Sequence, residues 1–301
     1  MSTNDGSTND GSTNDGSTND GSTTGASASG VSASGVSVAE QPLLDIRDLS
    51  VSYHRRGKGT PAIRDVSLDI RPGETVALVG ESGSGKSTLG RAVLGLTTVT
   101  QGTILFDGED ITRAGGARRK ELSKSVQAVF QDPNGSLNPA LTVGQTLAEP
   151  LRVHSRDERA VVLKRVREVL ALVGLPAEAA DRYPRQFSGG QRQRIAIARA
   201  LVMAPKLIVC DEPVSALDLS VQAQVLNLFS DLQRETGVSY LFISHDLAVV
   251  RHLAQRIVVL YRGDVVESGT TEEVYADAQH PYTRKLLAAA GVEGAPATSA
   301  R

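Results

Sequence analysis

The chain contains, at residues 80–88, the stretch Gly80-Glu81-Ser82-Gly83-Ser84-Gly85-Lys86-Ser87-Thr88. Two glycines, separated by four free positions and followed by Lys and Ser, match the pattern of a phosphate-binding loop. The apolar run 75–79 before it predicts a buried strand, and apolar residues at helical spacing over 89–96 predict a helix after it. In this context glycine lets backbone N–H groups face one point, where the helix N-terminus adds partial positive charge. All nine residues are therefore candidates for binding a nucleotide.

The last three residues of this stretch predict separate roles. Lys86 can reach the β- and γ-phosphates, the Ser87 hydroxyl can hold Mg²⁺, and Thr88 adds a second hydroxyl near the phosphates. The alternative is a glycine-rich surface turn, which the strand and helix on either side argue against. Kinases, GTPases and motor ATPases share the pattern, so the loop alone does not name the reaction.

Composition limits the classes of protein that fit. The net charge of −2 becomes +3 without residues 1–40, which hold five acidic and no basic groups. Such balance gives no electrostatic case for a nucleic-acid partner. The single cysteine, Cys210, excludes an intramolecular disulfide framework and fits a reducing compartment. No apolar run approaches the roughly 20 residues that span a bilayer, and the N-terminus shows no signal-peptide pattern. We therefore expect a cytosolic protein whose membrane association depends on partners.

The chain divides into a repetitive start and an ordered remainder. Residues 2–21 are four copies of Ser-Thr-Asn-Asp-Gly, and the low apolar content of 1–40 predicts a disordered tail, either a spacer or an inert expansion. Order is expected over 43–290, and 291–301 is expected to be a flexible tail. Strands are expected at 43–53, 66–70, 103–106 and 126–130, and then at 207–210, 240–243 and 257–261, between helices at 219–235 and 247–254. This alternation predicts a mostly parallel sheet with helices on its faces.

Two segments interrupt or extend that alternation. Residues 147–180 have apolar positions at helical spacing, so we expect a helical subdomain at about 132–188, inserted into the α/β domain. The segment 265–290 is expected to hold a strand end, a short acidic helix near 272–275 and a last helix from about Pro281.

The apolar run 207–210 is followed by two carboxylates, Asp211 and Glu212. Beside a phosphate-binding loop, one carboxylate can hold Mg²⁺ and its neighbour can polarise the attacking water. If the strand geometry continues, the two side chains point to opposite sides and can hold different roles. The alternative is that two acidic residues only end a strand.

A second anion-binding end is predicted at Ser188-Gly189-Gly190-Gln191, where a hydroxyl and two glycines open a helix at 192–202. Placed about a hundred residues after the phosphate loop and just before the carboxylate strand, this stretch resembles the signature of ABC transporter ATP-binding subunits. The resemblance covers about 43–290. It implies a P-loop NTPase fold of the α/β class, with a mostly parallel sheet core, an antiparallel β part and an inserted α-helical subdomain.

The resemblance assigns further residues. Gln131 matches the Q-loop glutamine, which contacts Mg²⁺ and the attacking water, and residues 215–218 match the D-loop that crosses the dimer seam. His245 matches the switch histidine at the γ-phosphate, and Tyr53 matches the aromatic residue that stacks on adenine; taken alone, each could be an ordinary structural residue. The catalytic candidates are thus Glu212, His245, Lys86 and Gln131, and the metal candidates are Ser87, Gln131 and Asp211. The one departure from the signature, Phe187 where many members have Leu, leaves the anion-binding residues intact.

Two stretches resemble the branch of oligopeptide, dipeptide and nickel importers, namely 129–139 around the Q-loop and 265–289 at the C-terminus. The resemblance implies ATP and Mg²⁺ as cofactors, and a homo- or heterodimer with a second ATPase subunit. It also implies two transmembrane permease subunits and, indirectly, an external substrate-binding protein, at the cytoplasmic face of the membrane. The expected function is ATP hydrolysis coupled to peptide import. The alternatives are nickel or another small solute as cargo, and a soluble ABC ATPase acting on ribosomes or DNA.

Overall fold

The computed structural model describes residues 41–55, 58–155 and 157–291, so the expectations for 1–40 and for 292–301 lie outside it. The strands are β1 (Leu44–Arg55), β2 (Lys58–Ile70), β3 (Thr75–Val79), β4 (Gln101–Phe106), β5 (Glu109–Asp110), β6 (Val126–Phe130), β7 (Leu207–Asp211), β8 (Ser239–Ser244), β9 (Arg256–Tyr261) and β10 (Asp264–Thr270). The helices are α1 (Lys86–Val93), α2 (Gly116–Leu122), α3 (Pro133–Ser136), α4 (Val143–His154), α5 (Arg159–Leu172), α6 (Gly189–Leu201), α7 (Leu219–Thr236), α8 (Leu247–Leu253), α9 (Thr271–Ala276) and α10 (Pro281–Ala289). Two short 3₁₀ helices, η1 (Ala177–Asp181) and η2 (Pro184–Gln186), precede α6.

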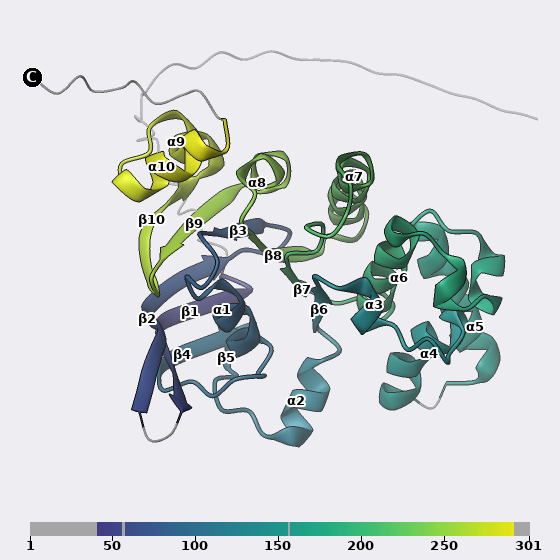
Figure 1. Cartoon of the computed structure of the whole chain (residues 1–301). Helices are drawn as coiled ribbons and strands as arrows, with labels where there is room; N and C mark the ends of the chain where they lie inside the picture. The colour runs from purple at the N-terminus through teal and green to yellow at the C-terminus, as the bar shows by residue number, and fades with distance from the viewer. Residues whose placement is uncertain (1–40, 56–57, 156, 292–301) are drawn as a thin grey trace, which may run out of the picture. The chain divides into compact units, whose positions relative to one another are not determined.

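The strands form two sheets (Figure 1). The larger has the order β10-β9-β3-β8-β7-β6, in which β9, β3, β8, β7 and β6 are parallel and β10 pairs antiparallel with β9. The smaller has the order β2-β1-β4-β5 and is antiparallel throughout. A mostly parallel core with an antiparallel part confirms the predicted fold class.

Side chains of the central strands of the larger sheet, such as β3, β7 and β8, alternate between two buried faces, because successive residues of a strand point to opposite sides. In β7, Leu207 and Val209 belong to the core shared with α1 and the smaller sheet. Ile208 and Cys210 belong to the core shared with α4 to α7. A third core joins β3 and β9 to α8, α9 and α10. Burial on both faces explains why these strands read as continuous apolar runs.

Helices occupy the connection between β6 and β7. α4 begins at a capping box in which the Thr142 hydroxyl accepts from the Gln145 N–H and the Gln145 side chain accepts from the Thr142 N–H. Buried apolar residues of α4, α5 and α6 share one core with the parallel strands. The expected helical stretch at 147–180 is therefore two α-helices and a 3₁₀ turn, and it begins earlier, at Val143.

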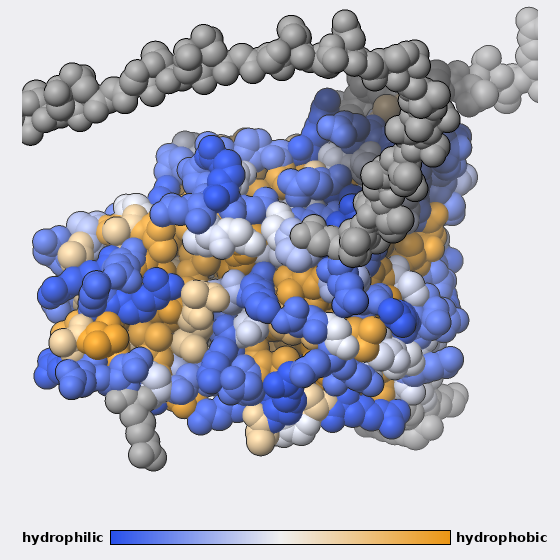
Figure 2. All heavy atoms as spheres, turned by 180° about the vertical axis from the view of Figure 1, so that it is seen from behind, coloured by the Kyte–Doolittle hydropathy of each residue, from blue (hydrophilic) through white to orange (hydrophobic). Residues whose placement is uncertain are grey.

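Two elements, β2 and α1, have bounds that differ from those expected from the sequence. β2 begins at Lys58, well before the expected start at Val66, because it pairs with β1 along its whole length, for example Ile63 with Val51. α1 ends at Val93, and Gly95 follows with φ 69°, so Leu96 lies beyond the helix and is 64% exposed. On the face that Figure 2 shows, hydrophilic side chains surround separate hydrophobic patches. None of the helices in the described residues is long and apolar enough to cross a membrane.

Candidate nucleotide-binding site

The loop 80–85 joins β3, which lies between β9 and β8, to α1. Gly80 and Gly85 have φ of 151° and 109°, in the region that side chains rarely adopt. A Cβ on Gly80 would lie 2.1 Å from the Leu260 carbonyl oxygen, and one on Gly85 would lie 2.5 Å from Ile63 Cγ2. Both ends of the loop therefore require glycine, for space as well as for conformation.

Lys86 is buried and folds back over this loop. Its Nζ donates to the carbonyl oxygens of Gly80 at 2.7 Å and Glu81 at 2.9 Å. Burial lowers the pKa of Lys86, while the nearby charges of Glu212 and Asp211 oppose that shift. The loop thus holds an ammonium group on its own backbone, close to two carboxylates.

The Ser87 hydroxyl donates to Asp211 Oδ1 at 2.8 Å, which joins the start of α1 to the end of β7. Parallel strands bring their carboxyl ends to one edge of the sheet, and β3, β8 and β7 are neighbours there. The structure therefore brings two of the three predicted metal residues together. Within the described residues, no group of three or more His, Cys, Asp and Glu side chains could hold a metal ion by itself.

Glu212 and His245 lie together at the ends of β7 and β8. His245 Nδ1 is 3.1 Å from Glu212 Oε2, and the Glu212 N–H donates to the Ile243 carbonyl at 3.0 Å. Glu212 has φ 50°, so the strand geometry stops at Asp211. The condition under which strand alternation would point Asp211 and Glu212 to opposite sides is therefore not met, because Glu212 is in the left-handed conformation and not in the strand.

A cavity of about 360 Å³ lies over the loop. Its walls come from Tyr53, from 60–62 of β2, from the loop and α1 start, and from Glu212. The Tyr53 ring is 45% exposed, and its hydroxyl lies 3.3 Å from Thr88 Oγ1. This hydrogen bond is the largest cause that lowers the pKa of Tyr53. No pattern in the sequence points to residues 60–62, because only the pairing of β2 with β1 places them beside the loop.

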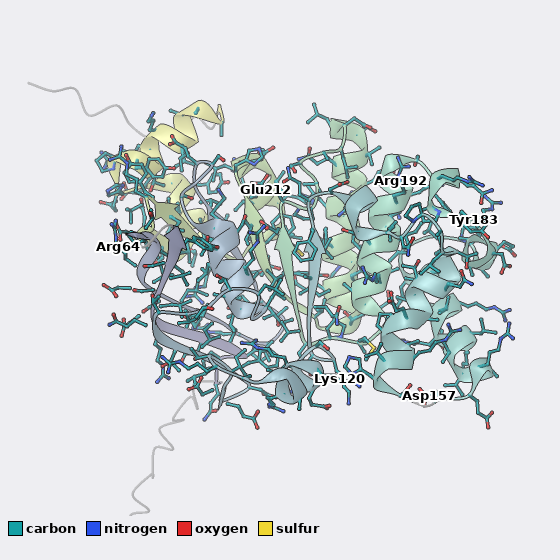
Figure 3. The ribbon with its side chains drawn as sticks, turned by 60° about the horizontal axis from the view of Figure 1, so that its bottom comes forward. Arg64, Lys120, Asp157, Tyr183, Arg192 and Glu212 are labelled. Atoms are coloured by element: carbon teal, nitrogen blue, oxygen red, sulfur yellow. The ribbon has the colours of Figure 1, made fainter. Side chains whose placement is uncertain are left out.

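The predicted second anion-binding end is separate from this cavity. Ser188 caps α6 in a capping box: its hydroxyl accepts from the Gln191 N–H at 3.3 Å, and Gln191 Oε1 accepts from the Ser188 N–H at 3.0 Å. In Figures 1 and 3, α6 lies on the side of β6 and β7 opposite to α1, with Glu212 between them over the strand ends. Neither 188–191 nor Gln131, which is exposed directly after β6, lines the cavity.

The D-loop candidate continues from Glu212. The Ser215 hydroxyl donates to the Glu212 carbonyl at 3.0 Å, and Asp218 Oδ1 accepts from the Val221 N–H at 3.0 Å as the cap of α7.

The phosphate loop also contacts the C-terminal helix α10, which the sequence did not indicate. The Glu81 N–H donates to the Tyr282 hydroxyl of α10 at 2.7 Å, across 201 positions in the chain.

Comparison with known proteins matches this chain to a family model and to curated import ATP-binding proteins. A family model described as ABC transporter matches residues 63–215. The chain is 49% identical over 262 residues to the glutathione import ATP-binding protein GsiA of Salmonella choleraesuis, which covers 85% of this chain and 42% of that protein. It is also 49% identical over 252 residues to a putative peptide import ATP-binding protein of Brucella ovis, covering 84% of this chain and 80% of the relative.

A solved structure agrees with these sequence matches. It is the dimeric post-hydrolysis state of the ATP-binding cassette MJ0796 bound to ADP and Pi. It matches with a TM-score of 0.68 and 31% identity, over 76% of this chain and 98% of that one.

Proposed function

Because this chain belongs to the ABC transporter family, we propose that it is the subunit that binds and hydrolyses ATP for a membrane importer of peptides. One observation carries the proposal. A single cavity is lined by the phosphate loop, by Lys86 and by Glu212, and Glu212 is paired with His245. This arrangement supports the proposal, because a cation that can bind phosphate and a carboxylate that can act on water line the same cavity.

The cavity fits a nucleoside triphosphate in its lining and its charge. Backbone N–H groups of the loop and the start of α1 face anionic phosphates, and Lys86 stabilises charge on the β- and γ-phosphates. The exposed Tyr53 ring offers a flat apolar wall for adenine at the other end of the cavity.

Ser87 and Asp211 fit a magnesium site that the nucleotide completes. Mg²⁺ prefers oxygen ligands and is usually held by one or two carboxylates together with substrate phosphates. A hydroxyl and a carboxylate oxygen 2.8 Å apart offer two such ligands, and Gln131 would be a third once its segment approaches. When bound, the ion would neutralise charge on the phosphates.

Glu212 acts on water in this proposal. Its carboxylate orients a water molecule and accepts a proton from it as the water oxygen bonds to the γ-phosphorus, while the bond to the β–γ bridging oxygen breaks and ADP leaves. His245 holds the Glu212 carboxylate from one side and donates to the γ-phosphate oxygens as their charge grows.

A second copy of this fold completes the site, either an identical chain or a paralogous ATPase subunit. The Ser188 end lies away from the cavity of its own chain and still has the features of an anion-binding helix start. In a head-to-tail dimer, Ser188 to Gln191 of one subunit would meet the γ-phosphate held by Lys86 of the other. The similar cassette MJ0796 was solved as a dimer with ADP and Pi.

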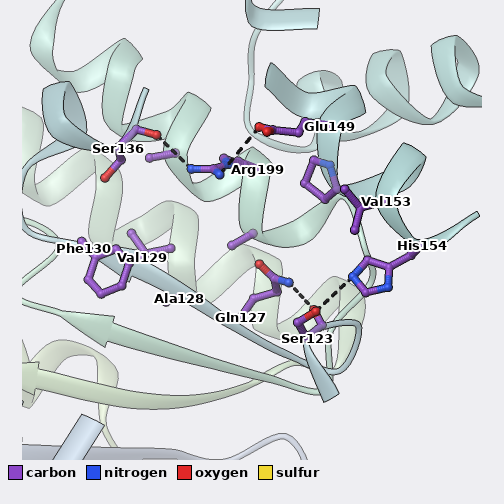
Figure 4. A pocket seen from close by; sticks show the side chains of 13 residues that line it. Ser123, Gln127, Ala128, Val129, Phe130, Ser136, Glu149, Val153, His154 and Arg199 are labelled. Atoms are coloured by element: carbon purple, nitrogen blue, oxygen red, sulfur yellow. Dashed lines mark hydrogen bonds and ion pairs between the residues drawn. The ribbon is translucent and has the colours of Figure 1, made fainter. Parts of the chain in front are cut away.

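The membrane partner would dock beside the Gln131 segment. A groove of about 330 Å³ lies between β6, the α3 region, α4 and α6 (Figure 4). Arg199 donates to the Ser136 carbonyl at 2.9 Å and lies 3.9 Å from Glu149, while His154 Nε2 lies 3.0 Å from Ser123 Oγ. We propose that two transmembrane permease subunits insert into these grooves, which places the chain at the cytoplasmic face of the membrane.

This position would let the helices between β6 and α6 act as one subdomain that transmits closure of the nucleotide site. Peptides are the proposed cargo because the relatives carry peptide or glutathione import in their names. An external binding protein would deliver them, and nickel or another small solute is the alternative cargo.

The Glu212→Gln variant tests this function. It keeps the volume of the side chain and removes its basicity, so ATP affinity should be unchanged while turnover falls by about 100-fold or more. ATP binding is measured with a fluorescent analogue and turnover by phosphate release. Glu235→Gln, an exposed residue near the end of α7, is the matched control and should behave as the unaltered chain. Undiminished hydrolysis by Glu212→Gln would remove Glu212 from the catalytic role.

A further inference from the structure

The peptide group between Gly80 and Glu81 is held from both of its edges. Its N–H, on Glu81, donates to the Tyr282 hydroxyl at 2.7 Å. Its C=O, on Gly80, accepts from Lys86 Nζ at 2.7 Å. Because a peptide unit is planar and rigid, a constraint on one edge orients the other. Tyr282 and Lys86 are therefore connected through a single rigid group, although they lie on α10 and α1.

Tyr282 is itself firmly placed. It is 7% exposed, and its ring packs on Tyr261 of β9 with the centroids 4.2 Å apart. The start of α10 is anchored to β10, because the Glu267 carboxylate accepts from the N–H groups of Gln279 at 2.6 Å and His280 at 3.0 Å. The hydroxyl oxygen is thus a fixed acceptor and not a mobile one.

The orientation of this peptide group determines where the Lys86 ammonium group points. An ammonium group has three N–H donors. Two of those of Lys86 are used on the carbonyls of Gly80 and Glu81, which leaves one for a phosphate in the cavity. A hydrogen bond to the N–H of a peptide polarises its carbonyl and strengthens the bond that the carbonyl accepts. The Tyr282 hydroxyl therefore supports the bond that aims Lys86.

We infer that Tyr282 is a positioning residue for Lys86, through which the C-terminal segment 264–289 controls the affinity of the phosphate loop for nucleotide. The inference rests on the proposed ATP-binding function and adds to it a residue outside the cavity. Tyr282 touches neither nucleotide nor water in this account, so it acts on binding and not on the chemical step.

The test compares two Tyr→Phe variants of the full chain. Tyr282→Phe keeps the ring against Tyr261 and removes only the hydroxyl. The matched control is Tyr275→Phe: Tyr275 lies on α9 in the same segment and is also 7% exposed, but its hydroxyl donates to the Leu247 carbonyl of α8, away from the loop. Measured quantities are the Kd and KM for ATP, kcat, the melting temperature without nucleotide, and the amide exchange rate at Glu81.

Tyr282→Phe should raise the Kd and KM for ATP by about threefold to tenfold, the effect of one hydrogen bond, with kcat nearly unchanged. It should also speed exchange of the Glu81 N–H. Tyr275→Phe should change neither the Kd and KM for ATP, nor kcat, nor the exchange rate of the Glu81 N–H. Equal loss of affinity in both variants would mean that the effect comes from general loosening of the C-terminal segment. Unchanged affinity in Tyr282→Phe would mean that Tyr282 does not position Lys86. Failure of the unaltered chain to bind ATP would instead contradict the proposed function.

Discussion

Two exposed valines illustrate how little a single residue reveals by its exposure alone. Val153 on α4 and Val161 on α5 are each 53% exposed. Val153 lines the groove beside β6 and α6, together with Glu149 and Arg199. Val161 lies on a different surface, between α5 and the end of α6. Only the first of these surfaces adjoins the segment that leads to Gln131.

We therefore expect Val153→Gln to weaken association with the permease subunits and Val161→Gln to leave it intact. Exposed substitutions change stability by no more than about 0.5 kcal/mol, so both variants should fold and hydrolyse ATP normally in isolation. The measurement is co-purification of the chain with the solubilised membrane complex. Equal recovery of the two variants would place the membrane partner elsewhere.

At the scale of one element, the start of α6 has two separable properties. Ser188 caps the helix, and the same helix end is the candidate partner of a γ-phosphate. Asn and Asp are caps as good as Ser, and a negative charge at a helix N-terminus is favourable for the helix itself. The structural and the functional property can therefore be separated by charge.

Ser188→Asp and Ser188→Asn should both unfold at the denaturant midpoint of the unaltered chain. Ser188→Asp should lose about tenfold or more of ATP turnover, because a carboxylate opposing phosphate costs several kcal/mol. Ser188→Asn, which is neutral, should retain clearly more turnover than the Asp variant. If Ser188→Asp hydrolysed ATP at full speed, this helix end could not lie at a phosphate.

At the scale of the whole molecule, we propose that one chain holds two half-sites and no complete one, because its two candidate anion-binding ends are separate. Lys86 lines the cavity and Ser188 does not. A two-fold symmetric pair would bring the Lys86 end of each copy to the Ser188 end of the other. Two defective chains could then form one intact site between them.

Mixing Lys86→Ala chains with Ser188→Asp chains, each expected to be impaired alone, should restore ATP turnover. In each mixed dimer both defects fall in one site and the other is intact, so random pairing should recover about a quarter of the sites. Turnover is measured by phosphate release, with each variant alone as the control. An absence of recovery would mean that two copies of this chain do not form a shared site.

The sequence predicted best those elements whose pattern is local. β3 and the helix 219–235 were expected almost where they lie, because continuous apolar runs and a helical period are visible without knowledge of neighbours. α2 was not expected, since Leu122 is its only buried residue and a polar helix carries no period. The early start of β2 was not expected either, because pairing with β1 determines it.

The sequence by itself determined the phosphate loop, its strand and helix, the fold class and the identity of most candidate residues, because each depends on neighbours in the chain. Only the tertiary structure decided which of them meet. Glu212 reaches His245 through a left-handed turn, and the Gly80–Glu81 peptide finds the Tyr282 hydroxyl 201 positions away. Such contacts depend on how strands pair and helices pack, and the packing of distant segments has no signature within either segment.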